Sequence, residues 1–315
     1  MAVLRGLFIA LSESPRAQHF VLRNGLARRA SRRFVAGETL AEALAAVAKV
    51  NRLSIHASLN YLGEKTTSPG EAASAREKYI EILEAIHAER ADCNLSIKLS
   101  QLGIAIAESL AESHVQAVLE AARRADIFVR IDMEESPLAE PTLALWWRLW
   151  AEGHRNVGLV IQAYLYRSAQ DVETLVQAGA RIRLVKGAYL EPPSVAYPKK
   201  ADVDANYRRL MALLLRRGTY PAIATHDESL IAGARTQAAR EAIPPDRFEF
   251  QMIYGVRRDL QVALAREGYH VRVYVPFGEQ WYPYFMRRLA ERPANVFFLL
   301  RSLWAERPGA RTRQT

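Results

Sequence analysis

The sequence predicts an α/β protein whose 315 residues close into a single (β/α)8 barrel. Two observations lead to this fold: eight short β-rich runs occur after residue 50, and an amphipathic segment follows each of the first seven. The expected strands are Leu53–Leu59, Asn94–Leu99, Ile127–Asp132, Val157–Tyr164, Arg181–Gly187, Tyr220–Thr225, Phe248–Ile253 and Val271–Val275. The expected crossover helices are Ala72–Glu89, Ser109–Arg123, Pro141–Glu152, Ala169–Gln177, Ala205–Arg216, Glu228–Arg240 and Arg257–Arg266. A doubly wound open sheet has similar strands, but no Gly-x-Gly-x-x-Gly motif follows the first one, which argues against a dinucleotide-binding sheet.

The last expected strand, Val271–Val275, leads into a charged helix, Tyr282–Leu289. The strand alternates valines with polar residues, as half-buried strands do. The helix carries adjacent Arg287 and Arg288, and Glu291 follows at a spacing that lets it pair with either. Taken alone, this stretch is either a surface helix with solvated charges or a site that holds a small carboxylate against a flat ring.

Composition sets broad limits. Half of the residues are hydrophobic, so the chain can bury one large core. Cys93 is the only cysteine, which excludes an internal disulfide and a thiolate cluster and favours a reducing compartment. The seven histidines are scattered without ligand spacing, so no metal site is expected. A net charge of +9 suits nucleic acid, an anionic membrane surface or acidic ligands, and does not choose among them.

The domain organisation predicted is a basic helical arm at 1–36, the barrel at 37–303 and a flexible tail at 304–315. The arm has seven arginines and one acid, Glu13, up to Val35, a composition also typical of an organellar transit peptide. Thr39 is positioned to cap the first helix of the core. No run approaches the 20 apolar residues that a membrane span requires.

Polar side chains follow seven of the eight expected strands, at the end where barrel enzymes place their chemistry. In chain order they are Asn60 and Glu64, Lys98 and Gln101, Arg130 and Asp132, Gln162 and Tyr164, Arg183, Lys186 and Tyr189, Thr225, His226 and Asp227, and Gln251 and Tyr254. Any one of them is readily explained as a solvated or ion-paired residue. Their repetition around the barrel favours an active site.

Together these segments resemble the proline dehydrogenase family, flavoenzymes built on a distorted (β/α)8 barrel. The motifs that carry the resemblance are LGE (62–64), SIKLSQLG (96–103), RIDMEES (130–136), IQAYLYRS (161–168), RLVKGAYLEP (183–192), ATHD (224–227), FEFQMIYG (248–255) and VRVYVPFG with WYPYFMRRLAERPANV (271–296). The lack of an aldehyde dehydrogenase-like segment suggests the short monofunctional bacterial type.

The resemblance implies noncovalent FAD over the strand ends and oxidation of L-proline to Δ1-pyrroline-5-carboxylate by hydride transfer to flavin N5, the first step of proline catabolism. It also implies a quinone as electron acceptor. We expect a cytoplasmic protein that does not bind nucleic acid. The basic arm either attaches the protein loosely to the inner face of the cell membrane or packs over the barrel base.

The resemblance also carries roles onto positions of this sequence. The substrate site implied consists of Lys98, Asp132, Tyr189, Ile253, Tyr274, Arg287, Arg288, Glu64 and Glu291. Of these, Lys98 and the two arginines match carboxylate-binding cations, Asp132 orders them, and the two tyrosines and Ile253 box the pyrrolidine ring. Glu64 matches an acid that pairs with one of the arginines and closes the pocket, and Glu291 supports the same arginine.

The implied FAD contacts are Gln162, Arg183, Val185, Lys186, Gly187, Ala188, Thr225, His226 and Gln251. Two positions depart from the family pattern. Ile253 stands where leucine is frequent, a volume-conserving change. Asn60 stands where aspartate is usual, which removes a charge near the gate.

Three alternatives remain open from the residues alone. His226 suits a hydrogen-bonded structural histidine as well as a flavin contact. Lys98 or Lys186 on a barrel strand suits a Schiff-base aldolase. The basic pairs Arg28-Arg29 and Arg32-Arg33 suit a nucleic-acid-binding protein, although no recognised binding module accompanies them.

Overall fold

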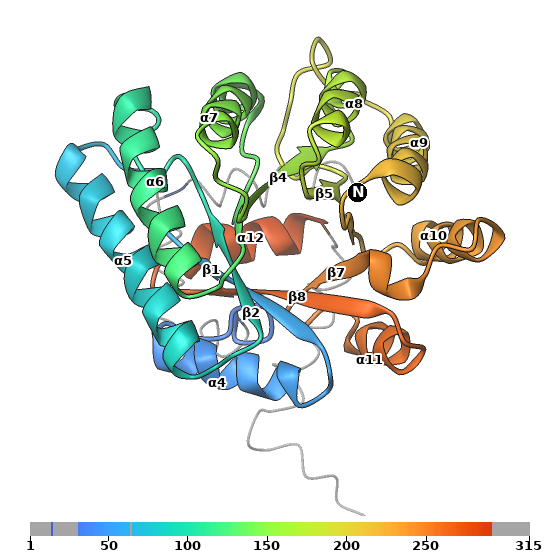
Figure 1. Cartoon of the computed structure of the whole chain (residues 1–315), viewed down its shortest axis with the longest axis horizontal. Coiled ribbons are helices and arrows are strands. Elements are labelled where there is room, and N and C mark those ends of the chain that lie inside the picture. Colours follow the sequence, from blue (N-terminus) through green and yellow to red (C-terminus); the bar gives the residue numbers. More distant parts are fainter. Residues whose placement is uncertain (1–13, 15–30, 64, 292–315) are drawn as a thin grey trace, which may run out of the picture.

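The computed structural model describes residues 14, 31–63 and 65–291, and within them eight parallel strands close into a barrel in chain order (Figure 1). The strands are β1 (His56–Tyr61), β2 (Cys93–Ile97), β3 (Val129–Ile131), β4 (Val157–Gln162), β5 (Ile182–Val185), β6 (Ala222–Ala224), β7 (Glu249–Ile253) and β8 (His270–Phe277). All eight predicted strands are confirmed, and closure of β8 on β1 rules out the open sheet. The first begins three residues later than predicted, because Ser54 adopts a left-handed φ of 56° that ends the preceding turn.

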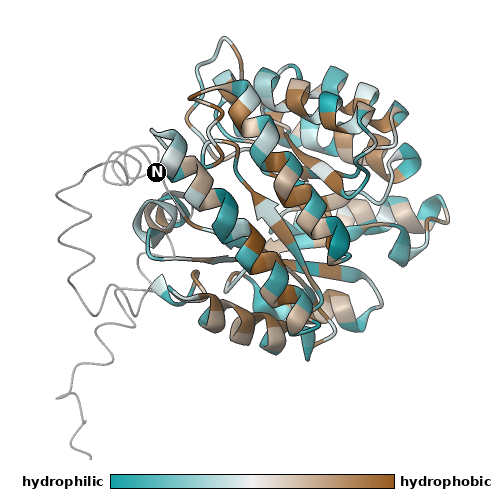
Figure 2. Ribbon diagram, turned by 60° about the vertical axis from the view of Figure 1, so that its left-hand side comes forward, coloured by the Kyte–Doolittle hydropathy of each residue, from teal (hydrophilic) through white to brown (hydrophobic). Residues whose placement is uncertain are grey.

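Helices surround the barrel as expected from the amphipathic segments. They are α4 (Leu40–Asn51), α5 (Pro69–Ala88), α6 (Glu108–Arg124), α7 (Ala139–Ala151), α8 (Ser168–Gln177), α9 (Lys200–Arg217), α10 (Glu228–Arg240), α11 (Arg258–Arg266) and α12 (Trp281–Glu291), with short 3-10 helices η1 (Ser136–Leu138) and η2 (Pro245–Arg247). The outer helices carry both hydrophobic and hydrophilic residues (Figure 2). None in the described part is long and apolar enough to cross a membrane.

Local sequence explains where the first helices begin. The Thr39 side chain accepts a hydrogen bond from the Glu42 backbone N–H, and the Glu42 carboxylate accepts one from the Thr39 N–H, which confirms the predicted cap. The Ser68 side chain caps α5 by accepting from the Glu71 N–H, and Pro69 occupies the first turn, where a missing N–H costs nothing.

The main core lies between the strands and the outer helices. Outward strand residues such as Ala57, Leu59 and Leu95 are buried beneath helix residues such as Val47 and Ile82. The helix α4 packs against β1 and β8 and covers the outside of the closing seam. This leaves the inner strand faces free to carry polar side chains.

Helix α12 does not join the outer ring; in Figure 1 it lies inside the circle of helices. It forms a second apolar cluster with residues that precede α4 and with a residue that follows β1. The cluster consists of Phe34, Val35, Leu62, Trp281, Tyr282, Tyr284, Phe285, Met286 and Leu289, with Ile253, Val256 and Tyr274 packed against it. Because Leu62, Ile253 and Tyr274 lie on or beside β1, β7 and β8, α12 covers the carboxyl ends of these strands. This placement departs from a regular (β/α)8 barrel, in which the helices form an outer ring, and it rejects the interpretation of α12 as a solvated surface helix.

The arm and tail assignments fall largely outside the described residues. Of the arm, Phe34 and Val35 are buried, so its last residues form part of the cluster under α12.

The amino-terminal half of the barrel interior is charged as well. Arg272 Nε donates to both oxygens of Glu249, at 3.1 and 3.0 Å, and its Nη1 donates to the Ala57 carbonyl at 2.8 Å. Arg130 is buried, and its Nη1 donates to the carbonyls of Leu159 and Arg181. These bonds tie β1, β3, β7 and β8 to their neighbours through side chains, in addition to the backbone ladder.

Gly158 in β4 makes room for Arg130, and we expect Gly158→Ala to destabilise the barrel. A Cβ at this position would press on the Arg181 carbonyl oxygen and lie 2.8 Å from Arg130 Nη1. Overpacking of this kind costs about 1–3 kcal/mol. The matched control is Gly70→Ala in α5, where a Cβ meets nothing within 4 Å and alanine favours the helix by up to about 1 kcal/mol. Urea midpoints followed by circular dichroism measure both; equal midpoints for the two variants would contradict the argument.

Candidate active site

Lys98, directly after β2, lies at the centre of a buried polar network. Its Nζ donates to Asn60 Oδ1 at 2.9 Å, to Asp132 Oδ2 at 3.0 Å and to Tyr274 Oη at 3.4 Å. An ammonium group has three protons, so each has an acceptor here. Burial acts to lower the pKa of Lys98, but the surrounding acidic groups, with Asp132 the strongest of them, together outweigh burial and raise the pKa. Lys98 is therefore a fixed cation.

Asp132, directly after β3, joins this cation to a second one. Its Oδ1 accepts from Arg183 Nη1 at 2.9 Å, and its Oδ2 accepts from the Tyr274 hydroxyl at 2.7 Å as well as from Lys98. Burial alone would raise the pKa of Asp132, but the charges of Lys98 and Arg183 lower it below its ordinary value. The carboxylate is ionised and orients side chains from β2, β5 and β8.

The predicted ring-box residues lie between this network and α12. Tyr274 and Ile253 pack against the apolar cluster of α12, as described above. Burial raises the pKa of Tyr189 to about 12, against the nearby charge of Lys98. The charge of Arg287 also acts on Tyr189, which places the first α12 arginine near the same pocket. The structure thus brings residues from β2, β5, β7, β8 and α12 together.

The second arginine, Arg288, is partly buried and lies with its guanidinium 5.1 Å from the centre of the Tyr284 ring. Glu64 lies outside the described residues, as does the side chain of Glu291. The predicted gate and brace therefore stay predictions.

The FAD positions divide into two groups. Gln162 and Arg183 point polar atoms into the barrel mouth: Gln162 Nε2 is anchored on the Met133 and Glu134 carbonyls, at 3.3 and 3.2 Å. Its Oε1 and the Nε of Arg183 are buried without a partner in the part of the chain that the structure describes. Buried polar atoms of this kind are rare in native proteins unless a ligand or water completes them. An acceptor and a donor that are both buried without a partner among the described residues fit the mixed C=O and N–H edge of a flavin ring.

The other FAD positions form the rim. Gly187 has a φ of +121°, and a Cβ there would lie 2.5 Å from the Tyr164 ring, so only glycine fits beside it. Val185 precedes it at the end of β5 and Ala188 follows it, both partly buried. Lys186 Nζ donates to Asp204 and Asp227 at 2.7 and 2.8 Å, which balances its charge.

The remaining FAD positions, Thr225, His226 and Gln251, form hydrogen bonds within and beside β6 and β7. Thr225 Oγ1 accepts from the Asp227 N–H at 3.1 Å, and Gln251 Nε2 donates to Glu249. His226 Nε2 accepts from the Ile253 N–H at 2.9 Å, so this ring has the structural role that the sequence left open. The bond fixes the backbone of Ile253, a predicted substrate contact, and leaves a flavin role for His226 as a prediction.

The roles of two residues were not predicted from the sequence. Ser96 accepts from Arg183 Nη2 at 3.1 Å and lies 3.1 Å from Ser58, so it positions the guanidinium from below. Asn60, expected at the polar end of the first strand and as a departure from the family pattern, is a direct partner of Lys98. The alternation of side chains along β2 could have indicated Ser96, because Ser96 lies two residues before Lys98 and so faces the same side of the strand.

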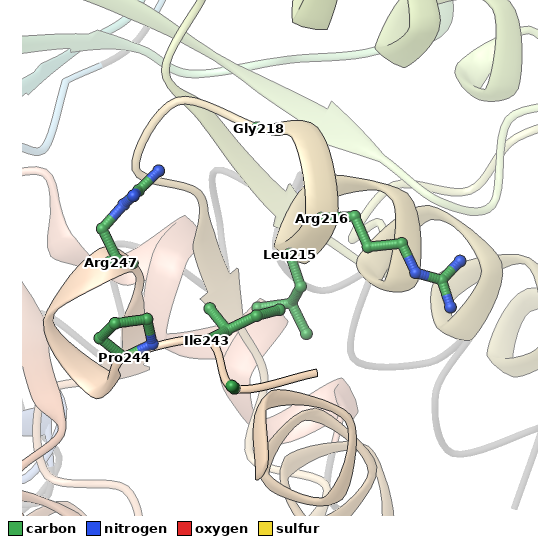
Figure 3. Close-up of a pocket in the computed structure, with 7 residues that line it drawn as sticks. Leu215, Arg216, Gly218, Ile243, Pro244 and Arg247 are labelled. Atoms are coloured by element: carbon green, nitrogen blue, oxygen red, sulfur yellow. The ribbon is translucent and has the colours of Figure 1, made fainter. Parts of the chain in front are cut away.

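A pocket on the outer surface, between α9 and the segment after α10, is not a comparable site (Figure 3). Arg216 and Arg247 point in different directions across it, and Glu241 already holds Arg216 at 2.9 and 2.8 Å. Binding sites need convergent polar groups, which this surface lacks. In the described ranges, no three His, Cys, Asp or Glu side chains gather as metal ligands would.

The model of one protein family, described as proline dehydrogenase, matches residues 43–301. The chain belongs to the proline dehydrogenase family. It is 44% identical to proline dehydrogenase of Deinococcus radiodurans over 275 residues, covering 86% of this chain and 89% of that one. It is 42% identical to proline dehydrogenase 1 of Bacillus subtilis (strain 168) over 301 residues, covering 96% of this chain and 99% of the relative.

Among solved structures, proline utilization A (PutA) from Bdellovibrio bacteriovorus inactivated by N-propargylglycine is similar, with a TM-score of 0.80 and 26% identity. The match covers 89% of this chain and 34% of PutA, so the chain spans about a third of that protein. The agreement with the proline dehydrogenase family confirms the sequence-based assignment and the closed barrel. It makes the network around Asp132 the candidate active site of an oxidoreductase.

We expect Asp132→Asn to destabilise this proline dehydrogenase family member in a pH-dependent way. Removing one partner of a buried ion pair costs about 3–5 kcal/mol, since the buried Arg183 and the partly buried Lys98 remain as cations. Because the pKa of Asp132 is lowered on folding, its contribution is fully present above the unfolded value of about 3.9 and is lost as pH falls through the folded value.

The measurement is the urea midpoint of wild type and Asp132→Asn at pH values above and below about 4. The gap between the two proteins should be large at neutral pH and should narrow in acid. A gap that is constant with pH would show that the ionisation of Asp132 is not what stabilises the network.

Proposed function

We propose that this chain oxidises L-proline to Δ1-pyrroline-5-carboxylate with FAD as cofactor and a quinone as electron acceptor. The observation that carries the proposal is the buried network of Lys98, Asp132, Arg183 and Tyr274 beneath the paired arginines of α12. It combines fixed positive charge with an aromatic wall, which are the two features that a cyclic amino acid requires of its site.

The substrate carboxylate is assigned to Arg287 and Arg288. A guanidinium presents a planar fork of donors that pairs bidentately with a carboxylate. Lys98 supports this site by its charge, since its three donors are already directed at Asn60, Asp132 and Tyr274. Glu64 and Glu291 are proposed to pair with the same arginines, the first of them as a gate.

The pyrrolidine ring is assigned to Tyr189, Ile253 and Tyr274. Tyr274 is held on both sides, because its hydroxyl donates to Asp132 and its ring lies 5.3 Å from the Arg183 guanidinium carbon. A wall fixed in this way excludes water and keeps the ring in one orientation, which contributes to rate through proximity. The partly buried Ile253 side chain supplies the apolar edge.

FAD, when bound, supplies the hydride acceptor at its N5 atom. The residues proposed to hold it are those at the strand ends: Gln162, Arg183, Val185, Lys186, Gly187, Ala188, Thr225, His226 and Gln251. Arg183 is prepared for this role by Asp132 and Ser96, which fix its two terminal nitrogens and leave Nε open. A preorganised cation at this point stabilises negative charge that develops on the acceptor.

A quinone acceptor places the enzyme near a membrane surface. The support is the basic composition of residues 1–36, because each Lys or Arg near an anionic leaflet contributes about 1 kcal/mol. We propose that this arm attaches the protein loosely to the membrane surface and that the protein is otherwise cytoplasmic.

The structure also weighs against the aldolase alternative. A Schiff-base lysine must lose its proton to attack a carbonyl. Lys98 and Lys186 are both ion-paired with buried or partly buried carboxylates, and the pKa of Lys98 is raised, so neither is prepared as a nucleophile.

The deciding experiment is anaerobic addition of L-proline to the purified protein. The proposal requires a yellow protein whose flavin absorbance bleaches with L-proline and returns on addition of a soluble quinone. A colourless protein, or a flavin that proline does not reduce, would overturn the cofactor and substrate assignments; reoxidation by oxygen but not by quinone would overturn only the acceptor.

We expect Arg287→Ala and Arg288→Ala to keep FAD and to raise the KM for proline at least tenfold. Loss of a charge-assisted partner from a buried carboxylate costs about 2–5 kcal/mol. The matched control is Arg124→Ala, an exposed arginine in α6. Steady-state kinetics with proline, and the ratio of flavin to protein absorbance, measure the two effects. A normal KM in both α12 variants would show that these arginines do not bind the carboxylate.

Tyr274 should also set the preference for proline over 4-hydroxyproline. A hydroxyl buried against the ring without partners costs about 1–3 kcal/mol, so wild type should favour proline by about one to two orders of magnitude. Tyr274→Ser opens space and should narrow the ratio of kcat/KM values, mainly by harming proline. Tyr274→Phe is the control, because it removes the hydroxyl bond to Asp132 but keeps the ring wall. If Tyr274→Ser leaves the ratio as it is in wild type, Tyr274 does not line the ring pocket.

A further inference from the structure

Asn60 is the feature of the site that the proposed function leaves unused. It is completely buried in β1 and points into the barrel, where its Oδ1 accepts from Lys98 Nζ at 2.9 Å. Its Nδ2 is buried and has no hydrogen-bond partner among the residues that the structure describes. One small side chain therefore fixes the central cation and also presents an uncommitted donor.

The neutrality of the Asn60 amide matters because of the charges that surround it. The hydrogen-bonded network contains two cations, Lys98 and Arg183, and one carboxylate, Asp132, which leaves one positive charge in excess. The next carboxyl group, Glu134, is directed elsewhere: it accepts from the Ser100 N–H at 2.9 Å and from the Ser100 hydroxyl. Burial also raises the pKa of Glu134, which reduces its tendency to carry charge.

Any acceptor at this position would hold the third proton of Lys98, but an ionised one would cancel the excess charge. A carboxylate in place of the Asn60 amide would compete with Asp132 for Lys98 and bring the network to neutrality. A neutral amide holds the ammonium without this cost. Its NH2 group adds a donor, and donors favour anionic ligands.

We infer that Asn60 is a charge-setting and positioning residue of the carboxylate subsite: it holds Lys98 in place as a neutral acceptor and preserves the positive charge that attracts the substrate carboxylate. The inference rests on the proposed assignment of that carboxylate to the site under α12. It makes the discrimination between anionic and cationic ligands a property of residue 60.

The test uses two ring ligands that each carry one of the charges of proline. Cyclopentanecarboxylate has the ring and the anion, and cyclopentylamine has the ring and the cation. Their inhibition constants against proline oxidation are measured at neutral pH in the FAD-loaded wild type, in Asn60→Asp and in Asn60→Ala. Asn60→Asp adds a charge at nearly constant volume, whereas Asn60→Ala removes the acceptor and donor without adding one.

We expect the inhibition constant of the carboxylate to rise in the order wild type, Asn60→Ala, Asn60→Asp, with Asn60→Asp at least tenfold above wild type. A unit charge a few ångströms away in a medium of effective dielectric constant about 20 has an effect of this size. The inhibition constant of the amine should stay the same or fall in Asn60→Asp. A purely structural role would move both ligands by the same factor.

Two results would overturn the inference: equal factors for the two ligands, or carboxylate binding in Asn60→Asp as tight as in Asn60→Ala. Should Asn60→Asp fail to fold, Asn60→Ala alone still decides, because it must weaken the carboxylate more than the amine. The proposed function fails separately, since wild type would then not oxidise proline at all.

Discussion

The ion pair between Lys98 and Asp132 is the interaction on which the rest of the site depends. Two opposite charges buried in a barrel are stable only when their remaining donors and acceptors are satisfied. Asn60, Tyr274 and Arg183 satisfy them, and each comes from a different strand. The pair thus determines where the aromatic wall and the guanidinium lie.

The fold could be predicted almost completely because its signals are local. A strand of period two followed by a helix of period 3.6 shows itself within a short window, and eight repetitions leave few architectures. Strand β1 begins later in the sequence than predicted, because the turn at Ser54 depends on one backbone conformation that composition does not reveal.

The arrangement of the site could be predicted only in part. The motifs named Lys98, Asp132 and Tyr274, but the bonds of Lys98 to Asn60 and of Arg183 to Ser96 depend on lateral register across the closed barrel. The same limit applies to α12: its sequence predicts a charged helix, whereas its place over the strand ends follows from tertiary packing with Leu62 and Phe34. His226 could have either role on sequence alone, and only its bond to Ile253 revealed the structural one.

The cluster under α12 joins the two extremes of the barrel in sequence. The ring centres of Phe34 and Phe285 lie 6.3 Å apart, although about 250 residues separate the two in the sequence. At a synthesis rate of about 5–20 residues per second, the ribosome adds Phe285 about 10–50 s after Phe34. During this interval, the α12 residues that pack against Phe34 and Val35 have not yet been synthesised. The nascent chain can therefore build strands and outer helices early, but it acquires a closed mouth only at the end. Substrate recognition is the last property that this polypeptide gains as it is made.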